Sequence, residues 1–184
     1  MKIAICIKQV PDSWAEKKMA GGVLDRAGVD AVLNDLDEYA VEEALRIVEA
    51  NSPTKEAGEA SGHSITLISM GPERATEAIR KALSMGADDA ILVSDPALAG
   101  SDALATSLVL AAVIKKGNYD LVLCGTESTD ARMSVIPAMI SQRLGWAQLT
   151  FAGKVAVNPA TTTVEIERVT EFGNQVMSAK FPAL

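Results

Sequence analysis

Short apolar segments alternate with segments of helical periodicity along most of this chain, and this alternation restricts the possible folds more than any other feature. The apolar segments lie at residues 2–8, 64–70, 90–93 and 121–124, and the helical segments lie at 37–50, 73–85, 102–115 and 138–144. Such an order is typical of successive β-α-β units, whose crossovers are right-handed. The sequence therefore predicts an α/β fold, with an open, Rossmann-like parallel sheet flanked by helices on both faces.

The pattern changes near the end of the chain, after Gln148. Segments at residues 155–157, 164–169 and 175–179 are typical of antiparallel strands, with turns expected at 158–161 and 171–174. We expect residues 1–184 to form a single domain, with residues 147–184 as an antiparallel strand extension. The last four residues, FPAL, follow a strand directly, which suggests a fragment of a longer protein.

The charge balance argues against some partners. The chain has 17 basic and 24 acidic residues, a net charge of −7, whereas nucleic-acid binding needs a clustered basic face. No apolar run approaches the ~18 residues of a membrane span. The first residues enter a strand without a leader pattern. We therefore expect a cytoplasmic protein that binds no nucleic acid and does not insert into membranes.

No set of residues in the sequence has the pattern of a catalytic or metal site. The only histidine, His63, lies in a loop where a solvent-facing side chain is expected, and no nucleophile elbow accompanies it. The two cysteines, Cys6 and Cys124, lie in separate strands without a CxxC motif, so we expect buried free thiols rather than metal ligands. Such a chain is expected to be a binding or carrier subunit rather than an enzyme.

One loop has the chemistry of an anion site. Residues 120–137, DLVLCGTESTDARMSVIP, begin as a strand and continue as a polar loop led by Gly125. Pro137 suits the first turn of the following helix, and Asp130 and Ser134 are both candidate caps. Loop N–H groups and the positive end of a helix dipole favour a phosphate, so the loop indicates a nucleotide site. A bulky residue at position 125 is expected to crowd that approach.

Several segments, in order and spacing, resemble one protein family. The chain is similar over its whole length to the beta subunit of electron transfer flavoprotein. The segments that carry the resemblance are ICIKQVPD (5–12), LNDLDEYAVEEAL (33–45), ISMGP (68–72), IRKALSMGAD (79–88), GTESTD (125–130), QLTFA (148–152) and VEIERVTEFGNQV (164–176).

The resemblance implies an electron-carrier subunit with an adenine-nucleotide-binding fold. Its partner would be an alpha subunit that holds most of the redox-active FAD. The pair would accept electrons from flavoprotein dehydrogenases such as acyl-CoA dehydrogenases. The beta subunit would bind AMP as a structural ligand. The family continues into a docking loop and a C-terminal arm that this sequence does not contain.

The resemblance also implies which residues line the nucleotide pocket. They lie on the first strand, before the first long helix, after the second strand and in the polar loop. Carried over by position, the residues are Cys6, Asn34, Asp35, Leu36, Asp37, Met70, Gly125, Thr126, Glu127, Ser128, Thr129, Asp130, Arg132, Ser134, Val135 and Ile136.

The roles of some of these residues stay open at the level of sequence. Asn34 would contact adenine or ribose, or only begin the helix; Asp130 would meet the ribose or cap a helix. Ser134 would bind phosphate or act as a cap. Many members of the family carry hydrophilic residues where this chain has Val135 and Ile136, so only backbone N–H groups remain there. Arg132 would supply charge nearby, or lie exposed.

Two other functions remain as alternatives. The chain could be a beta subunit of the electron-bifurcating kind, which holds a second FAD in place of AMP, because a less polar pocket suits a larger ligand. It could also be a stand-alone adenine-nucleotide binder or hydrolase similar to universal stress proteins. The absence of a glycine-rich triphosphate loop argues against the latter.

Overall fold

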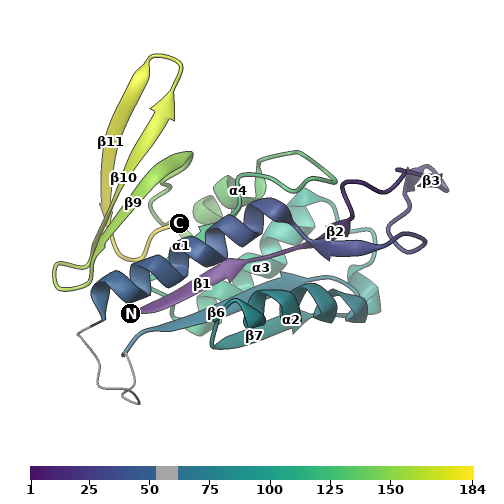
Figure 1. Cartoon of the computed structure of the whole chain (residues 1–184), viewed down its shortest axis with the longest axis horizontal. Coiled ribbons are helices and arrows are strands. Elements are labelled where there is room, and N and C mark those ends of the chain that lie inside the picture. The colour runs from purple at the N-terminus through teal and green to yellow at the C-terminus, as the bar shows by residue number, and fades with distance from the viewer. Residues whose placement is uncertain (53–61) are drawn as a thin grey trace.

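The fold is built on a parallel sheet of four strands. A computed structural model describes residues 1–52 and 62–184. The strands are β1 (Lys2–Cys6), β6 (Ser64–Met70), β7 (Asp89–Val93) and β8 (Leu121–Cys124), in the order β7-β6-β1-β8, and all neighbours are parallel (Figure 1). The predicted parallel sheet flanked by helices is confirmed.

Two helices cover each face of this sheet. α1 (Asp35–Asn51) and α2 (Thr76–Ser84) pack on one face, and α3 (Ala103–Gly117) and α4 (Ile136–Leu144) pack on the other. Side chains of a strand point alternately to the two faces. Ile3 and Ile5 of β1 accordingly join the α1 side of the core, whereas Ala4 joins the α3–α4 side.

The end of the chain forms a separate antiparallel sheet. Its strands are β9 (Ala152–Asn158), β10 (Thr163–Thr170) and β11 (Gly173–Lys180), with β10 in the middle. The sheet projects from the body beside α1 (Figure 1), and Val164 and Ile166 of β10 are buried against the α1 side of the core. The predicted antiparallel strands are confirmed; that residues 1–184 form one domain stays a prediction.

Residues 12–30 form an arm at the opposite end of the molecule (Figure 1). Short strands β2 (Gln9–Pro11) and β5 (Ala31–Leu33) pair at its base, and β3 (Met19–Ala20) pairs with β4 (Val23–Leu24) at its tip. Arg74, in the short 3-10 helix η1 (Glu73–Ala75), donates hydrogen bonds to three carbonyl oxygens of the arm. A second 3-10 helix, η2 (Pro96–Leu98), precedes α3.

Several local predictions need correction. The first strand ends at Cys6 rather than at residue 8, because the N–H of Lys8 donates to Asp37 instead of to the sheet. The sequence predicts Ser101 as the cap of the helix at 102–115. α3 is instead capped by Asp102, whose side chain accepts from the N–H of Ala105. The sequence also suggests a short hairpin around Val23 and Val29. In the described arm Val23 pairs with Ala20, and Val29 lies outside any strand. The polar segment 51–62 is typical of a loop, and residues 53–61 of it lie outside the described residues.

Candidate functional site

The strand order creates a crevice at one edge of the sheet. The chain leaves β1 for β6 on one side, and β8 returns to pair with β1 on the other side. The helices that follow β1 and β8, α1 and α4, therefore lie on opposite faces. Open α/β sheets bind ligands at such a topological switch point, outside the carboxyl ends of the strands. Here that edge carries Lys8, after β1, and the polar loop 125–135, after β8.

Asp37, in the first turn of α1, joins both strand ends. Its buried carboxylate accepts hydrogen bonds from the N–H of Lys8, at 2.8 Å, and from the N–H of Gly125. Burial disfavours the charged form and raises the pKa of Asp37 to about 7, although these hydrogen bonds oppose the shift. Asp37 therefore fixes the starts of two loops, and its protonation changes near neutral pH.

Gly125 is required by its contact with α1. A Cβ atom at this position would lie 2.5 Å from Oδ1 of Asp37 and 2.8 Å from the carbonyl oxygen of Leu36. The sequence predicted that the glycine leaves room for a ligand. The structure gives a different reason, which is the close approach of the loop backbone to the first turn of α1.

Asn34 ties the polar loop to the entry of α1. Its side-chain amide donates to the carbonyl oxygen of Glu127 at 2.9 Å, and its Oδ1 accepts from the N–H of Thr129 at 3.0 Å. The side chain is buried and also donates to Asp37. Asn34 is thus a helix-entry residue that shapes the loop through both ends of its amide.

Asp130 is the charged centre of the loop. Its side chain is 1% exposed, and it forms ion pairs with Nζ of Lys8 at 2.8 Å and with Nε of Arg26 at 2.9 Å. Burial opposes the charged form of Asp130. The hydrogen bonds from Lys8, Ser128 and Arg26 prevail and lower the pKa to about 2. Two cations face one carboxylate, so this cluster carries a net positive charge.

The later part of the loop is held in an unusual backbone conformation. Arg132 and Ser134 both have positive φ, 51° and 54°, and both donate to the carboxylate of Glu127. α4 begins with Val135 as its N-terminal cap residue and has no side-chain cap, so neither Asp130 nor Ser134 is a cap. Left-handed backbone at non-glycine residues is often found at functional sites.

Thr129 has the one buried side-chain oxygen or nitrogen without a hydrogen-bond partner among the described residues. Its backbone N–H is paired with Asn34, but its Oγ1 is not satisfied. A buried hydroxyl without a partner costs free energy, and a bound ligand or water would remove that cost.

The other predicted pocket residues fall into three groups. Cys6, Met70 and Ile136 pack against the core on the α3–α4 face, on the opposite side of the sheet from α1. Leu36, Thr126 and Ser134 line an open cavity of about 430 Å³ between α1, β8 and the antiparallel sheet. The remaining two are Asp35, which is exposed at the start of α1, and Val135, which is half-buried before α4.

Sequence reasoning missed the two cations of the site. Lys8 is the last residue of the apolar segment 2–8, at the sheet edge where ligands are expected, and this position could have singled it out. No sequence pattern marks Arg26 as a site residue, because it lies on the arm and reaches Asp130 from 104 residues away in the chain.

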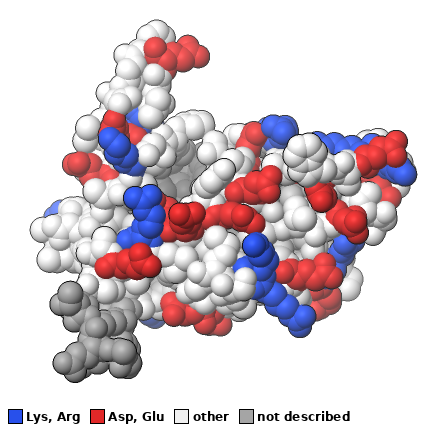
Figure 2. Space-filling model, in the orientation of Figure 1, with Lys and Arg blue, Asp and Glu red and all other residues white. Residues whose placement is uncertain are grey.

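Away from this edge of the sheet, the described residues show no comparable cluster of polar and charged side chains. His63 is half-buried rather than solvent-facing, since its ring nitrogens contact the amino group of Met1 and the carbonyl of Asn51. No group of three or more potential metal ligands is present in residues 1–52 and 62–184, and no helix there is long and apolar enough to cross a membrane. On the face shown in Figure 2, basic and acidic side chains are interspersed.

A family model and several curated proteins match this chain over most or all of its length. The family model described as "Electron transfer flavoprotein domain" matches residues 21–184. The electron transfer flavoprotein subunit beta of Mycobacterium bovis is 45% identical over 185 residues, which cover 99% of this chain and 67% of the relative. The subunit of the same name from Megasphaera elsdenii is 39% identical, over 100% of this chain and 67% of the relative.

A third relative, Protein FixA of Azotobacter vinelandii, is 39% identical, over 100% of this chain and 64% of the relative. The chain thus spans about two thirds of the length of the curated relatives it matches. It belongs to the electron transfer flavoprotein beta subunit family.

Proposed function

We propose that this chain is the beta subunit of a heterodimeric electron transfer flavoprotein and binds AMP as a structural ligand at the switch point between β1 and β8. The observation that carries the proposal is the cluster of Lys8, Arg26 and Asp130 beside the polar loop. The cluster has one more positive than negative charge, and the side chains of Lys8 and Arg26 are 39% and 47% exposed. Both cations therefore remain accessible to an anion.

The neighbouring loop supplies complementary groups for a nucleotide. Lys8 and Arg26 would hold the phosphate, together with free N–H groups of loop 125–135. The unsatisfied Oγ1 of Thr129 would bond to a hydroxyl of the ribose or to a phosphate oxygen. Asn34 and Asp37 would act as positioning residues, because their polar groups already hold the loop.

The nucleotide can be identified directly. The purified chain is denatured, and any released nucleotide is identified by chromatography and absorbance. We expect AMP. Release of FAD would instead assign the chain to the kind of beta subunit that holds a second FAD. Recovery of neither, also after incubation with AMP, would contradict the proposed site.

A variant tests the role of the cationic cluster. Arg26→Met removes one phosphate ligand, and we expect AMP to bind at least about tenfold more weakly, the equivalent of one hydrogen bond to a charged group. Lys18→Met is the matched control, because Lys18 lies on the same arm and its ion pair among the described residues is with the exposed Glu16. Binding is measured by calorimetry. Equal affinities of the two variants would exclude Arg26 from the site.

The partners follow from the same proposal. An alpha subunit would hold the redox-active FAD, and flavoprotein dehydrogenases such as acyl-CoA dehydrogenases would donate electrons to it. The chain itself would not be an enzyme but a carrier subunit that orients the FAD-bearing partner. Co-purification with an alpha subunit, followed by a flavin spectrum of the complex, tests this assembly. A chain that stays alone in the presence of alpha would contradict it.

A further inference from the structure

The two cysteines of the chain stand side by side at the carboxyl end of the parallel sheet. Cys6 is the last residue of β1, Cys124 is the last residue of β8, and the two are direct partners in the parallel register. Partners in a parallel pair point to the same face of a sheet. Both thiols accordingly pack against the core on the α3–α4 face.

Their spacing suits a covalent bond. Neighbouring strands lie about 4.8 Å apart, which falls within the Cα separation of about 4.4–6.8 Å found across disulfides. A hydrogen bond between the two thiols, together with burial, raises the pKa of Cys124. The strand register and the shared face place the two thiols beside each other in the reduced protein.

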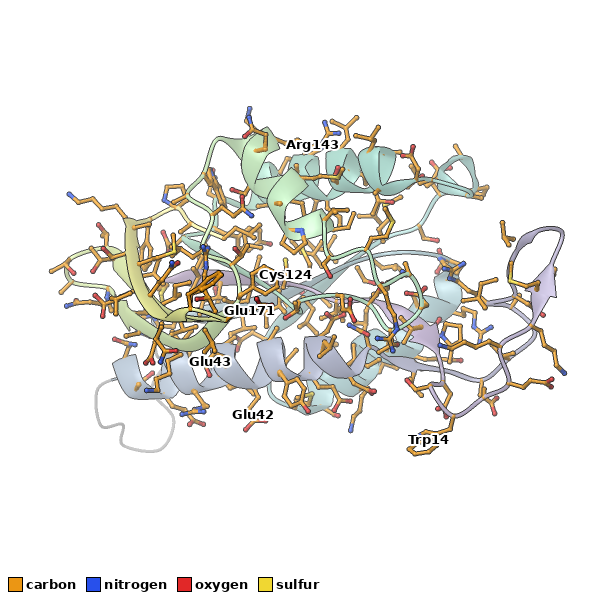
Figure 3. The ribbon with its side chains drawn as sticks, turned by 90° about the horizontal axis from the view of Figure 1, so that it is seen from above. Trp14, Glu42, Glu43, Cys124, Arg143 and Glu171 are labelled. Carbon is orange, nitrogen blue, oxygen red and sulfur yellow. The ribbon has the colours of Figure 1, made fainter. Side chains whose placement is uncertain are left out.

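Both cysteines are free and only partly buried. Figure 3 places Cys124 near the middle of the molecule, between α1 and the α3–α4 pair, at the end of β8 where the polar loop begins. Each residue therefore keeps some surface that a small reagent can contact in the folded protein.

We propose that Cys6 and Cys124 are a dithiol modification site, which forms an intramolecular disulfide by exchange with a low-molecular-weight disulfide such as oxidised glutathione. The inference is independent of the nucleotide proposal, because it depends on the strand register alone. It adds a thiol-sensitive cross-link between the two strands that border the switch point.

The chemistry balances as two successive exchanges. The thiolate of Cys6, formed by loss of its proton to solvent, attacks one sulfur of the small disulfide and releases one thiolate. The thiolate of Cys124, after loss of its own proton, then attacks the sulfur of Cys6 and releases the second. Two thiols of the protein are oxidised, one disulfide is reduced to two small thiols, and the two protons end on these products.

Intact mass and non-reducing peptide mapping test the proposal. The native chain is incubated with oxidised glutathione, and we expect the loss of two hydrogen atoms and a cross-linked peptide pair that contains Cys6 and Cys124. The variants Cys6→Ser and Cys124→Ser lack the second thiol, so at most a stable glutathionyl adduct should form. An unmodified wild-type chain, or one that keeps glutathionyl groups, would overturn the proposal.

A second probe on the wild-type chain requires neither variants nor oxidation. Phenylarsine oxide bridges two thiols that lie close together, with release of water. We expect one arsenical per native chain and the loss of both titratable thiols. If both thiols still titrate after treatment, they do not face each other, and the proposed site is wrong.

Discussion

At the scale of single residues, the loop after β8 is fixed by contacts that tolerate little change. Gly125→Ala would place a methyl group 2.5 Å from Oδ1 of Asp37 and 2.8 Å from backbone atoms of Leu36. We expect a loss of about 1–3 kcal/mol in the free energy of unfolding, as for other overpacked sites. Unfolding of the wild type and the variant in denaturant measures this difference in free energy.

The control for this variant is Gly71→Ala. A Cβ atom there would meet only the Cβ of Ala75, at 3.3 Å. Its effect should be clearly smaller, since a slight shift of a methyl group relieves the contact. A loss equal to that of Gly125→Ala would show that the contact with α1 is not the reason for the glycine at position 125.

Asp37 should make the stability depend on pH. Its pKa rises from 3.8 to about 7 on folding, so between these values the folded state binds more protons than the unfolded state. Stability from this group therefore falls as the pH rises from about 4 to about 7. Between pH 5 and pH 8 we expect a loss of about 2–3 kcal/mol in the free energy of unfolding from this group.

The variant Asp37→Asn should reduce this loss, because an amide does not titrate. Asp35→Asn, an exposed position in the same turn of α1, should keep the wild-type difference. Urea unfolding at the two pH values gives both results. An undiminished pH difference in Asp37→Asn would assign the effect to another group.

At the scale of elements, the arm of residues 12–30 has few strand contacts of its own and is held by side chains from elsewhere. Arg74 donates to the carbonyl oxygens of Arg26, Ala27 and Val29. These bonds position Arg26 for its ion pair with Asp130. The arm therefore completes the candidate site although it lies outside the parallel sheet.

Arg74→Ala should loosen the arm while the sheet stays intact. We expect faster tryptic cleavage at Lys17, Lys18 and Arg26, with only a small change in the midpoint of global unfolding, because local opening is governed by local contacts. Arg80→Ala, at an exposed position of α2, is the control. Unchanged cleavage in Arg74→Ala would mean that other contacts hold the arm.

At the scale of the whole molecule, local sequence patterns account for the order of the elements. The expected strands at residues 64–70 and 121–124 match β6 and β8 at both ends. Buried parallel strands are continuous apolar runs, and helices show their own period, so both signals are local in sequence. Helix starts were less well predicted, because Ser101 and Asp102 are both good caps and only the geometry of the first turn selects Asp102.

The sequence by itself determined the α/β class, the antiparallel end and the position of the polar loop at a strand end. Only the tertiary structure decided what that loop contacts. Asn34 and Asp37 lie about 90 residues from the loop in the chain, and Arg26 reaches Asp130 across 104 residues. Such partners are set by strand order and helix packing rather than by neighbours in sequence, and the same holds for the pairing of Cys6 with Cys124.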